Sequence, residues 1–251
     1  MSVTWVIARR EANSILRQRR MLLFAVGFGV VIPLVAGAGV VGLVMRLSSY
    51  VEVTSLGHLH AALHVTGLQH LVQGMLVWLG IFPILFSAQF AAIAFASERE
   101  RRSLPALLAT PAPLGAMIAG KLLASLAPGW ATVLASFGVY LAGVNAVAPE
   151  ATAWLPADMV IGALLFLIAL SLLVNGTALL ISARSHTIAG ASSTVTFVSL
   201  PASIATVVFA TLMGVLGTVA VVGIALAIAG FAAIVLLLGT ALWRREEILA
   251  N

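Results

Sequence analysis

Apolar residues along the chain fall into six long runs, each bounded by charged or turn-forming residues. A helix needs about 20 apolar residues to cross the hydrocarbon core of a bilayer. The runs are continuously apolar rather than alternating, which favours helices over the strands of a membrane barrel. The pattern therefore predicts six transmembrane helices, at about residues 21–45, 72–97, 122–144, 159–183, 188–212 and 216–242.

The boundary between the last two runs is the weakest in this pattern. Only residues 213–215 separate them, so five spans is the alternative to six. The first run is too long for the apolar region of a signal peptide, and no clear small-residue cleavage site follows it, so we interpret it as a retained span. The expected fold class is all-α, a polytopic membrane protein with a single transmembrane domain over residues 1–251.

Charged residues are scarce, and this scarcity limits the classes of protein to which the chain can belong. Asp, Glu, Lys and Arg make up 8% of the chain and hydrophobic residues 62%. Since a soluble domain carries about 25% charged residues, this composition excludes a soluble enzyme, a disordered chain and a nucleic-acid-binding module. The chain has no cysteine, so cysteine-based metal and disulfide chemistry is absent and the redox compartment is not indicated.

The few basic residues indicate the orientation in the membrane. Twelve of the thirteen Lys and Arg residues fall on the same side as the N-terminus, and only Arg46 falls on the other. Positively charged loops are retained in the cytoplasm, so both termini are expected to be cytoplasmic. An even number of spans agrees with this arrangement. Membrane orientation thus explains the basic character, and no nucleic-acid partner is expected.

Residues 3–20 show the pattern of an amphipathic helix. Apolar side chains recur at helical spacing along one stripe, which holds Trp5, Ala8, Ala12, Ile15 and Leu16. Arg9, Arg10 and Arg17 occupy the rest of the surface. A helix of this kind can lie in the plane of the membrane interface. Two roles are open, a simple membrane anchor or a lever that touches a cytoplasmic partner.

The segment between the second and third runs, residues 98–121, is the richest in signals. It contains a charge cluster at 98–102, a short apolar stretch at 104–108, and two prolines, Pro111 and Pro113, that stop a helix just before them. A short helix held by a rigid turn at the cytoplasmic face suits docking into a groove of a partner. The plainer alternative is a charge cluster that only determines topology.

This segment resembles the signature region of the ABC-transporter type-2 permease family. That region has an acidic–basic cluster, a short helix with a Leu-Leu pair, a Thr-Pro turn and a Gly-Lys pair at the third span. The corresponding residues here are Glu98, Arg99, Glu100, Ser103, Leu107, Leu108, Thr110, Pro111, Gly120 and Lys121. One departure is Leu104-Pro105, where the family more often has Thr-Leu-Glu, and Pro105 is tolerable in a first helical turn.

The resemblance extends over essentially the whole chain. The N-terminal helix is similar to the interface helix of the family through Arg9, Arg10, Glu11 and Arg17. The link 182–185 after the fourth span and the Arg-Arg-Glu tail at 244–246 also fit.

The resemblance implies the membrane subunit of an ATP-driven exporter in the plasma (inner) membrane. Two copies of a separate ATPase subunit would bind ATP and Mg, and a second permease would complete a homodimer or heterodimer around one pathway. The helix within residues 103–110 would be the coupling helix, and Glu98 and Glu100 would make charged contacts beside it. The resemblance places the translocation path near Gln89, Phe90, Phe197 and Ser203.

Other functions have little support in the sequence. The stretch from Gly115 to Lys121 matches a phosphate-binding loop, but Leu122 replaces the required Ser or Thr and no strand precedes it. No H-E-x-x-H, G-x-S-x-G or pair of intramembrane carboxylates is present, so no enzyme is expected. No ionisable side chain lies inside the predicted spans, which argues against a proton- or sodium-coupled transporter. A stand-alone channel, scaffold or assembly factor without an ATPase is the alternative to the exporter.

The first outer loop, between the first two predicted spans, is rich in histidine, with His58, His60, His64 and His70. His60 and His64 have the i, i+4 spacing of a helical metal-ligand pair. The preferred interpretation is an outer amphipathic segment with solvated histidines. The alternative is a permease with a metal-handling station at His60 and His64. The sequence does not identify the transported substrate.

Overall fold

The structure is a computed structural model. It describes residues 3–16, 23–24, 26–44, 46, 57–102, 113–212, 216 and 218–241, with side chains at all of these except 3, 11–16, 57–68, 114, 218 and 240–241. Across these ranges every regular element is a helix and none is a strand.

Six helices are long and apolar enough to cross a membrane, as the pattern of apolar runs predicts. The first span, Gly27–Val44, combines the π-helical turns η1 (Gly27–Val31) and η2 (Val35–Val41) with the short helix α3 (Ile32–Leu34). The other five are α5 (Gly57–Glu100), α7 (Leu114–Val147), α8 (Ala157–Arg184), α9 (Ile188–Leu212) and α10 (Thr218–Ala241). Because α9 and α10 are separate helices, six spans rather than five is confirmed.

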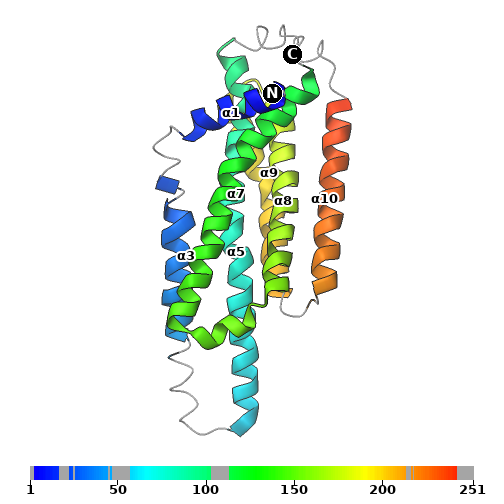
Figure 1. Ribbon diagram of the computed structural model, residues 1–251. Coiled ribbons are helices and arrows are strands. Elements are labelled where there is room, and N and C mark those ends of the chain that lie inside the picture. Colours follow the sequence, from blue (N-terminus) through cyan, green and yellow to red (C-terminus); the bar gives the residue numbers. More distant parts are fainter. Residues whose placement is uncertain are drawn as a thin grey trace.

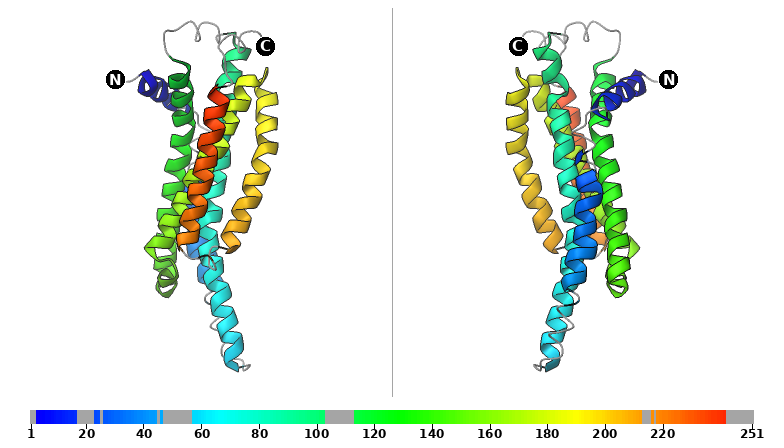
Figure 2. Two further views of the ribbon diagram at one scale, coloured as in Figure 1. Left: turned by 90° about the vertical axis from the view of Figure 1, so that its right-hand side faces the viewer. Right: turned by 90° about the vertical axis from the view of Figure 1, so that its left-hand side faces the viewer.

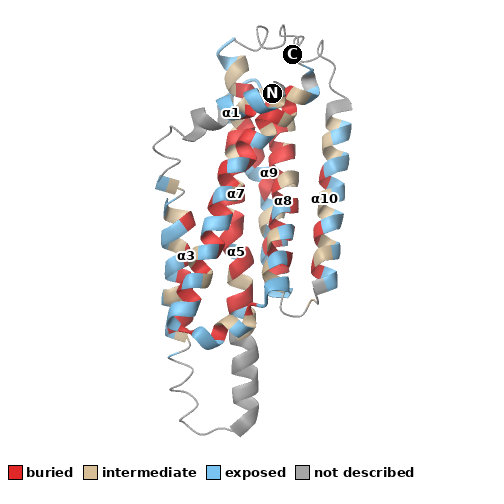
Figure 3. Ribbon diagram, viewed as in Figure 1, coloured by how far each residue is buried: buried red, intermediate tan, exposed pale blue. Residues whose placement is uncertain are grey.

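Helix α5 is the centre of the bundle. It packs against α7, α8 and α9, while α10 packs on α8 and the first span packs on α7. Figure 1 and the side views in Figure 2 show α9 and α10 on the outside of this arrangement. Buried residues concentrate on α5, α7 and α8 (Figure 3), so the inner three helices form the core and α9 and α10 present broad exposed apolar faces.

Glycines allow the first span to approach α7 closely. A Cβ at Gly37 would lie 2.7 Å from the carbonyl oxygen of Tyr140, and one at Gly143 would lie 3.1 Å from the backbone nitrogen of Ala38. Small residues at helix contacts of this kind let two backbones meet inside a membrane. Both contacts lie in the C-terminal half of the first span, where the two helices pack backbone to backbone.

Two helix boundaries differ from the sequence-based expectation. Helix α5 contains 44 residues and is therefore about 66 Å long, so it begins well within the segment predicted as an outer loop and extends past its neighbours (Figure 1). Helix α7 begins at Leu114, so Lys121 lies two turns inside it rather than at its edge. Lys121 therefore lies within the apolar helical stretch Gly115–Val147, one residue before the predicted start of the third span at 122.

A short helix lies across one end of the bundle. This is α1, Val3–Leu16, which packs on α7. The C-terminal ends of α5, α8 and α10 and the start of α7 lie at the same end (Figure 1). The described basic residues at this end are Arg9, Arg10, Arg99, Arg101, Arg102, Lys121 and Arg184.

The short 3-10 helix η3 (Pro149–Trp154) connects α7 to α8 at the end of the bundle opposite to α1. Gln73 of α5 donates a hydrogen bond from Nε2 to the carbonyl oxygen of Trp154, at 2.8 Å. This hydrogen bond ties the first half of α5 to the connection between α7 and α8.

Candidate functional site

A buried ion pair joins the end of α5 to the start of α7. Lys121 Nζ lies 2.9 Å from Glu98 Oε1, and the two side chains are 2% and 19% exposed. Lys121 is the chain's single lysine. A charge buried to this degree is retained in a folded protein only when it is paired, so Glu98 and Lys121 require each other.

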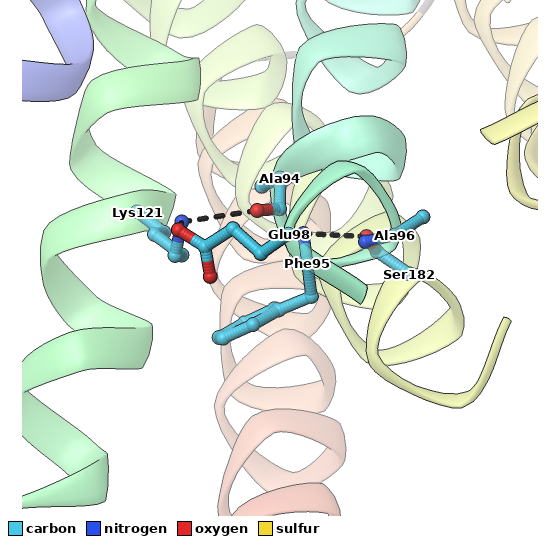
Figure 4. A network of polar contacts seen from close by, with 6 residues as sticks. All are labelled: Ala94, Phe95, Ala96, Glu98, Lys121 and Ser182. Atoms are coloured by element: carbon cyan, nitrogen blue, oxygen red, sulfur yellow. Dashed lines mark hydrogen bonds and ion pairs between the residues drawn. The ribbon is translucent and has the colours of Figure 1, made fainter. Parts of the chain in front are cut away.

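Two further groups of α5 surround the ammonium of Lys121 (Figure 4). Its Nζ donates a hydrogen bond to the carbonyl oxygen of Ala94 at 3.0 Å, and it lies 5.1 Å from the centroid of the Phe95 ring. Lysine donates up to three hydrogen bonds and is attracted to the face of an aromatic ring. One turn of α5 therefore holds the tip of Lys121 through a carboxylate, a carbonyl and a ring.

Helix α8 reaches the same turn of α5 through Ser182. Its Oγ accepts hydrogen bonds from two consecutive backbone N–H groups of α5, those of Phe95 at 2.9 Å and Ala96 at 3.1 Å. Three residues further along α5, Arg99 Nη1 donates to the carbonyl oxygen of Ser185 at 3.2 Å, where α8 ends. We call Glu98, Lys121, Ser182 and the backbone of residues 94–96 the junction, because it joins α5, α7 and α8.

The junction stands at both ends of the segment that the sequence predicts to dock on a partner. Helix α5 ends at Glu100, and Arg102 then adopts a left-handed backbone conformation (φ 58°) that turns the chain away from the helix. The chain returns through Pro113, which is extended and precedes the first turn of α7. Residues 103–112 lie outside the described residues, and the helix ends on either side of them are linked by Glu98 and Lys121.

The N-terminal helix packs directly beside the junction. Ala8 is buried against the bundle, and a Cβ at Gly120 would lie 2.9 Å from Ile7 Cγ2 and 3.1 Å from the carbonyl oxygen of Thr4. Only glycine at position 120 leaves room for this approach. The packed face of α1 thus contains Thr4, Ile7 and Ala8, and Trp5 is 53% exposed.

The residues of the predicted apolar stripe of α1 have different environments. Ala8 is buried against the bundle, whereas Trp5 is exposed beside the contact with α7. Arg9 and Arg10 are exposed, as the amphipathic pattern predicts. Glu11 belongs to α1, although its side chain is outside the described set, and Arg17 lies outside the described residues.

Of the seven predicted coupling residues, the structure describes two. Glu98 is in the junction and Glu100 is exposed as the last residue of α5. The remaining five lie outside the described residues, namely Ser103, Leu107, Leu108, Thr110 and Pro111. Their docking role stays a prediction. The sequence places Lys121 in the signature region and Ser182 in the link after the fourth span, but it indicates no coupling role for either residue.

The residues expected near a translocation path occupy different environments. Gln89 of α5 accepts a hydrogen bond from Ser192 Oγ at 2.5 Å and donates to Thr196 Oγ1 at 3.4 Å, which links α5 to α9. Phe197 is 72% exposed, and Ser203 is half-buried. Phe90 is buried and meets the ring of Phe86 edge-on at a centroid distance of 5.1 Å. Gln89 and its hydroxyl partners are therefore the polar part of the α5–α9 contact.

Other polar residues of the spans pair with one another inside the bundle. Asn175 Nδ2 donates to Ser87 Oγ at 3.0 Å, and Trp130 Nε1 donates to Ser171 Oγ at 2.7 Å. These bonds connect α5, α7 and α8 without reaching the exposed face of α9. They are packing contacts of the core, of the kind that membrane helices make with small polar side chains.

The two stretches that the sequence suggested as phosphate-binding and metal-binding sites both lie in helices. The stretch from Gly115 to Lys121 lies within α7, so its backbone is helical and does not form a phosphate-binding loop. His60 and His64 lie one turn apart in α5, with side chains outside the described set. Within the described part of the chain, no three His, Cys, Asp or Glu side chains gather as a metal ion would require.

The geometry defines a polytopic helical membrane protein whose charged groups cluster at one end of the bundle. A family model for the ABC-2 type transporter matches residues 2–214. The chain therefore belongs to the ABC-2 type transporter family and is a permease component of an ABC transporter. Among curated proteins, none matches the chain.

Proposed function

We propose that the chain is the permease subunit of an ATP-driven exporter, and that a separate ATPase subunit docks on the helix within residues 103–110. The observation that carries this proposal is the junction. Through Glu98 and Lys121 it links the last turns of α5, which precedes the docking segment, to the second turn of α7, which follows it, and it ties α5 to α8 through Ser182. A segment anchored in this way transmits a displacement to the spans instead of absorbing it.

The contacts define where a displacement would go. A displacement of the docking segment would move the end of α5 and the start of α7 together, because a buried ion pair resists separation. Helix α1 follows α7, since it packs at Gly120, one residue before Lys121. Helix α8 follows α5 through the hydrogen bonds of Ser182. In this proposal Glu98 and Lys121 position the segment, and Leu107 and Leu108 contact the ATPase.

The chain itself supplies no nucleotide site in this proposal. ATP and Mg bind to the partner ATPase, two copies of which serve a pair of permeases, either as a homodimer or as a heterodimer. The exposed face of α9 next to Gln89, with Phe197 and Ser203, borders the route between the two permeases. The end of the bundle that holds the junction faces the cytoplasm of the plasma (inner) membrane, in agreement with the basic residues gathered there.

The test is to disrupt docking without disturbing the spans. The variant Leu107→Asp with Leu108→Asp puts two carboxylates on the apolar side of the segment, and we expect it to abolish ATPase binding and ATP-driven transport. The matched control is Val147→Asp, which places a carboxylate at the exposed opposite end of α7 and leaves ATPase binding intact. Full ATP-driven transport by the double variant would refute the assignment of the docking segment.

A further inference from the structure

The contact between Ser182 and α5 differs from an ordinary helix-packing contact. A helix normally uses each backbone N–H to bond the carbonyl four residues earlier. Here one hydroxyl oxygen lies 2.9 Å and 3.1 Å from two successive amide nitrogens, those of Phe95 and Ala96, in the interior of a 44-residue helix. A side chain that inserts into the i→i−4 ladder is one of the few causes of a sharp helix bend.

The insertion lies where a bend would have the greatest effect. Lys121 is in contact with Ala94, Phe95 and Glu98 of α5. The turn of α5 that donates to the Ser182 hydroxyl therefore also holds the ion pair. Ser182 is fully buried, so water does not compete for the two N–H groups. The hydroxyl is therefore held against α5 by the packing of α8.

We propose that Ser182 is a positioning residue that holds α5 in a locally opened conformation, so that α8 sets the direction in which α5 presents Glu98 and the segment beyond it. The residue acts on the docking segment through α5 and contacts neither nucleotide nor substrate. Its consequence for ATP-driven transport rests on the proposed function, whereas its effect on the shape of α5 does not.

A bend of about 20°, the lower limit of a sharp helix bend, sets the size of the expected change. Without the hydroxyl, Phe95 and Ala96 donate only to carbonyls of their own helix, and α5 straightens at this turn. The lever from Ala96 to Arg101 is about 8 Å long, so removing a bend of about 20° moves its tip by about 3 Å. The outcome is measurable as a change in distance between the end of α5 and the end of α8.

The chain is well suited to this measurement because it has no cysteine. Spin labels on Arg101→Cys and His186→Cys, both exposed positions, report the distance between the two helix ends in the purified permease. We expect Ser182→Ala to shift the mean distance by about 3 Å, while Ser182→Thr, which keeps the hydroxyl, retains the original distance. Ser182→Gly replaces Ser182→Ala if that variant is not recovered as a folded protein.

A matched control separates this effect from a general loosening of the core. Ser125 is also buried, but its hydroxyl bonds only to the carbonyl of Leu122 in its own helix, so Ser125→Ala leaves the distance unchanged. An unshifted distance in Ser182→Ala, or an equal shift in Ser125→Ala, would overturn the proposal.

The same variants also separate the two proposals. With the ATPase bound, we expect Ser182→Ala to lower the ATP turnover of the complex about tenfold, and Ser182→Thr to restore it. A shifted distance with unchanged turnover would confirm that Ser182 shapes α5 and would refute the coupling role proposed for the junction.

Discussion

Neutralising Glu98 is the sharpest perturbation of the junction. The variant Glu98→Gln keeps the shape of the side chain and an oxygen that accepts a hydrogen bond, but removes its negative charge. The ammonium of Lys121, which is 2% exposed, then keeps its hydrogen bond to the carbonyl of Ala94 and its contact with the ring of Phe95. Neither of these two contacts carries a full negative charge, and the ammonium loses the carboxylate that lies 2.9 Å from it.

The magnitude follows from the burial of the two partners. Removing one partner of a buried ion pair costs about 3–5 kcal/mol, and because Glu98 is itself 19% exposed we expect the lower end, about 3 kcal/mol. Lys121→Met leaves a carboxylate that reaches water, so we expect about 2 kcal/mol. The double variant leaves no unpaired charge and should cost only about 1 kcal/mol, because neither Gln nor Met carries a charge that must be desolvated.

A double-mutant cycle measures this difference. The free energy of unfolding of the four proteins in mixed micelles should show a coupling of about 4 kcal/mol between positions 98 and 121. Arg101→Gln, at an exposed position of the same end, serves as the control and should change stability by less than about 0.5 kcal/mol. Additive effects of the two single variants would refute the mutual dependence of Glu98 and Lys121.

Three further substitutions test the close contacts and the exit of the chain from α5. Gly120→Val should displace α1 from α7 and cost about 1–3 kcal/mol. Gly115→Val is the control and should have neither effect, because a Cβ at Gly115 meets nothing within 4 Å. Loss of an engineered disulfide between α1 and α7 reports the displacement. Gly37→Ala should lower the thermal midpoint through its clash with the α7 backbone, and Gly27→Ala, which meets nothing, should raise it or leave it unchanged. Arg102→Gly should stabilise the protein by up to about 1 kcal/mol in chemical unfolding, because glycine adopts the left-handed conformation at no steric cost, and a destabilised variant would contradict this reason.

The spans were predictable because a bilayer imposes a length and a composition on any helix that crosses it. All six predicted runs correspond to helices in the structure. Their ends were less predictable, since a charged residue ends an apolar run but does not end a helix. Lys121 was taken as a boundary, yet α7 continues through it because Glu98 compensates its charge. The helical start of α5 was missed because its histidine-rich residues are too polar to resemble a span, although none of them stops a helix.

The candidate site was predictable only in part. The charge cluster that includes Glu98 was predictable because it is the densest group of charged residues in an otherwise apolar chain. The partner of Glu98 and the contact made by Ser182 depend on which helices lie side by side, and a sequence pattern does not report that. Which residues of the apolar stripe of α1 pack on α7 was not predictable for a related reason. Helical periodicity identifies residues that share a face, whereas the space left by Gly120 decides which face is used.

The docking of an ATPase on the segment between α5 and α7 is tested most directly by cross-linking in the assembled transporter. Since the chain has no cysteine, Leu107→Cys introduces a single thiol, and Val147→Cys provides the same thiol at the opposite end of α7. After purification in gentle detergent and reaction with a thiol-specific photo-cross-linker, the account predicts an adduct with an ABC ATPase from position 107 and none from position 147. Absence of an ATPase from the purified complex, or an adduct that forms equally from both positions, would contradict it.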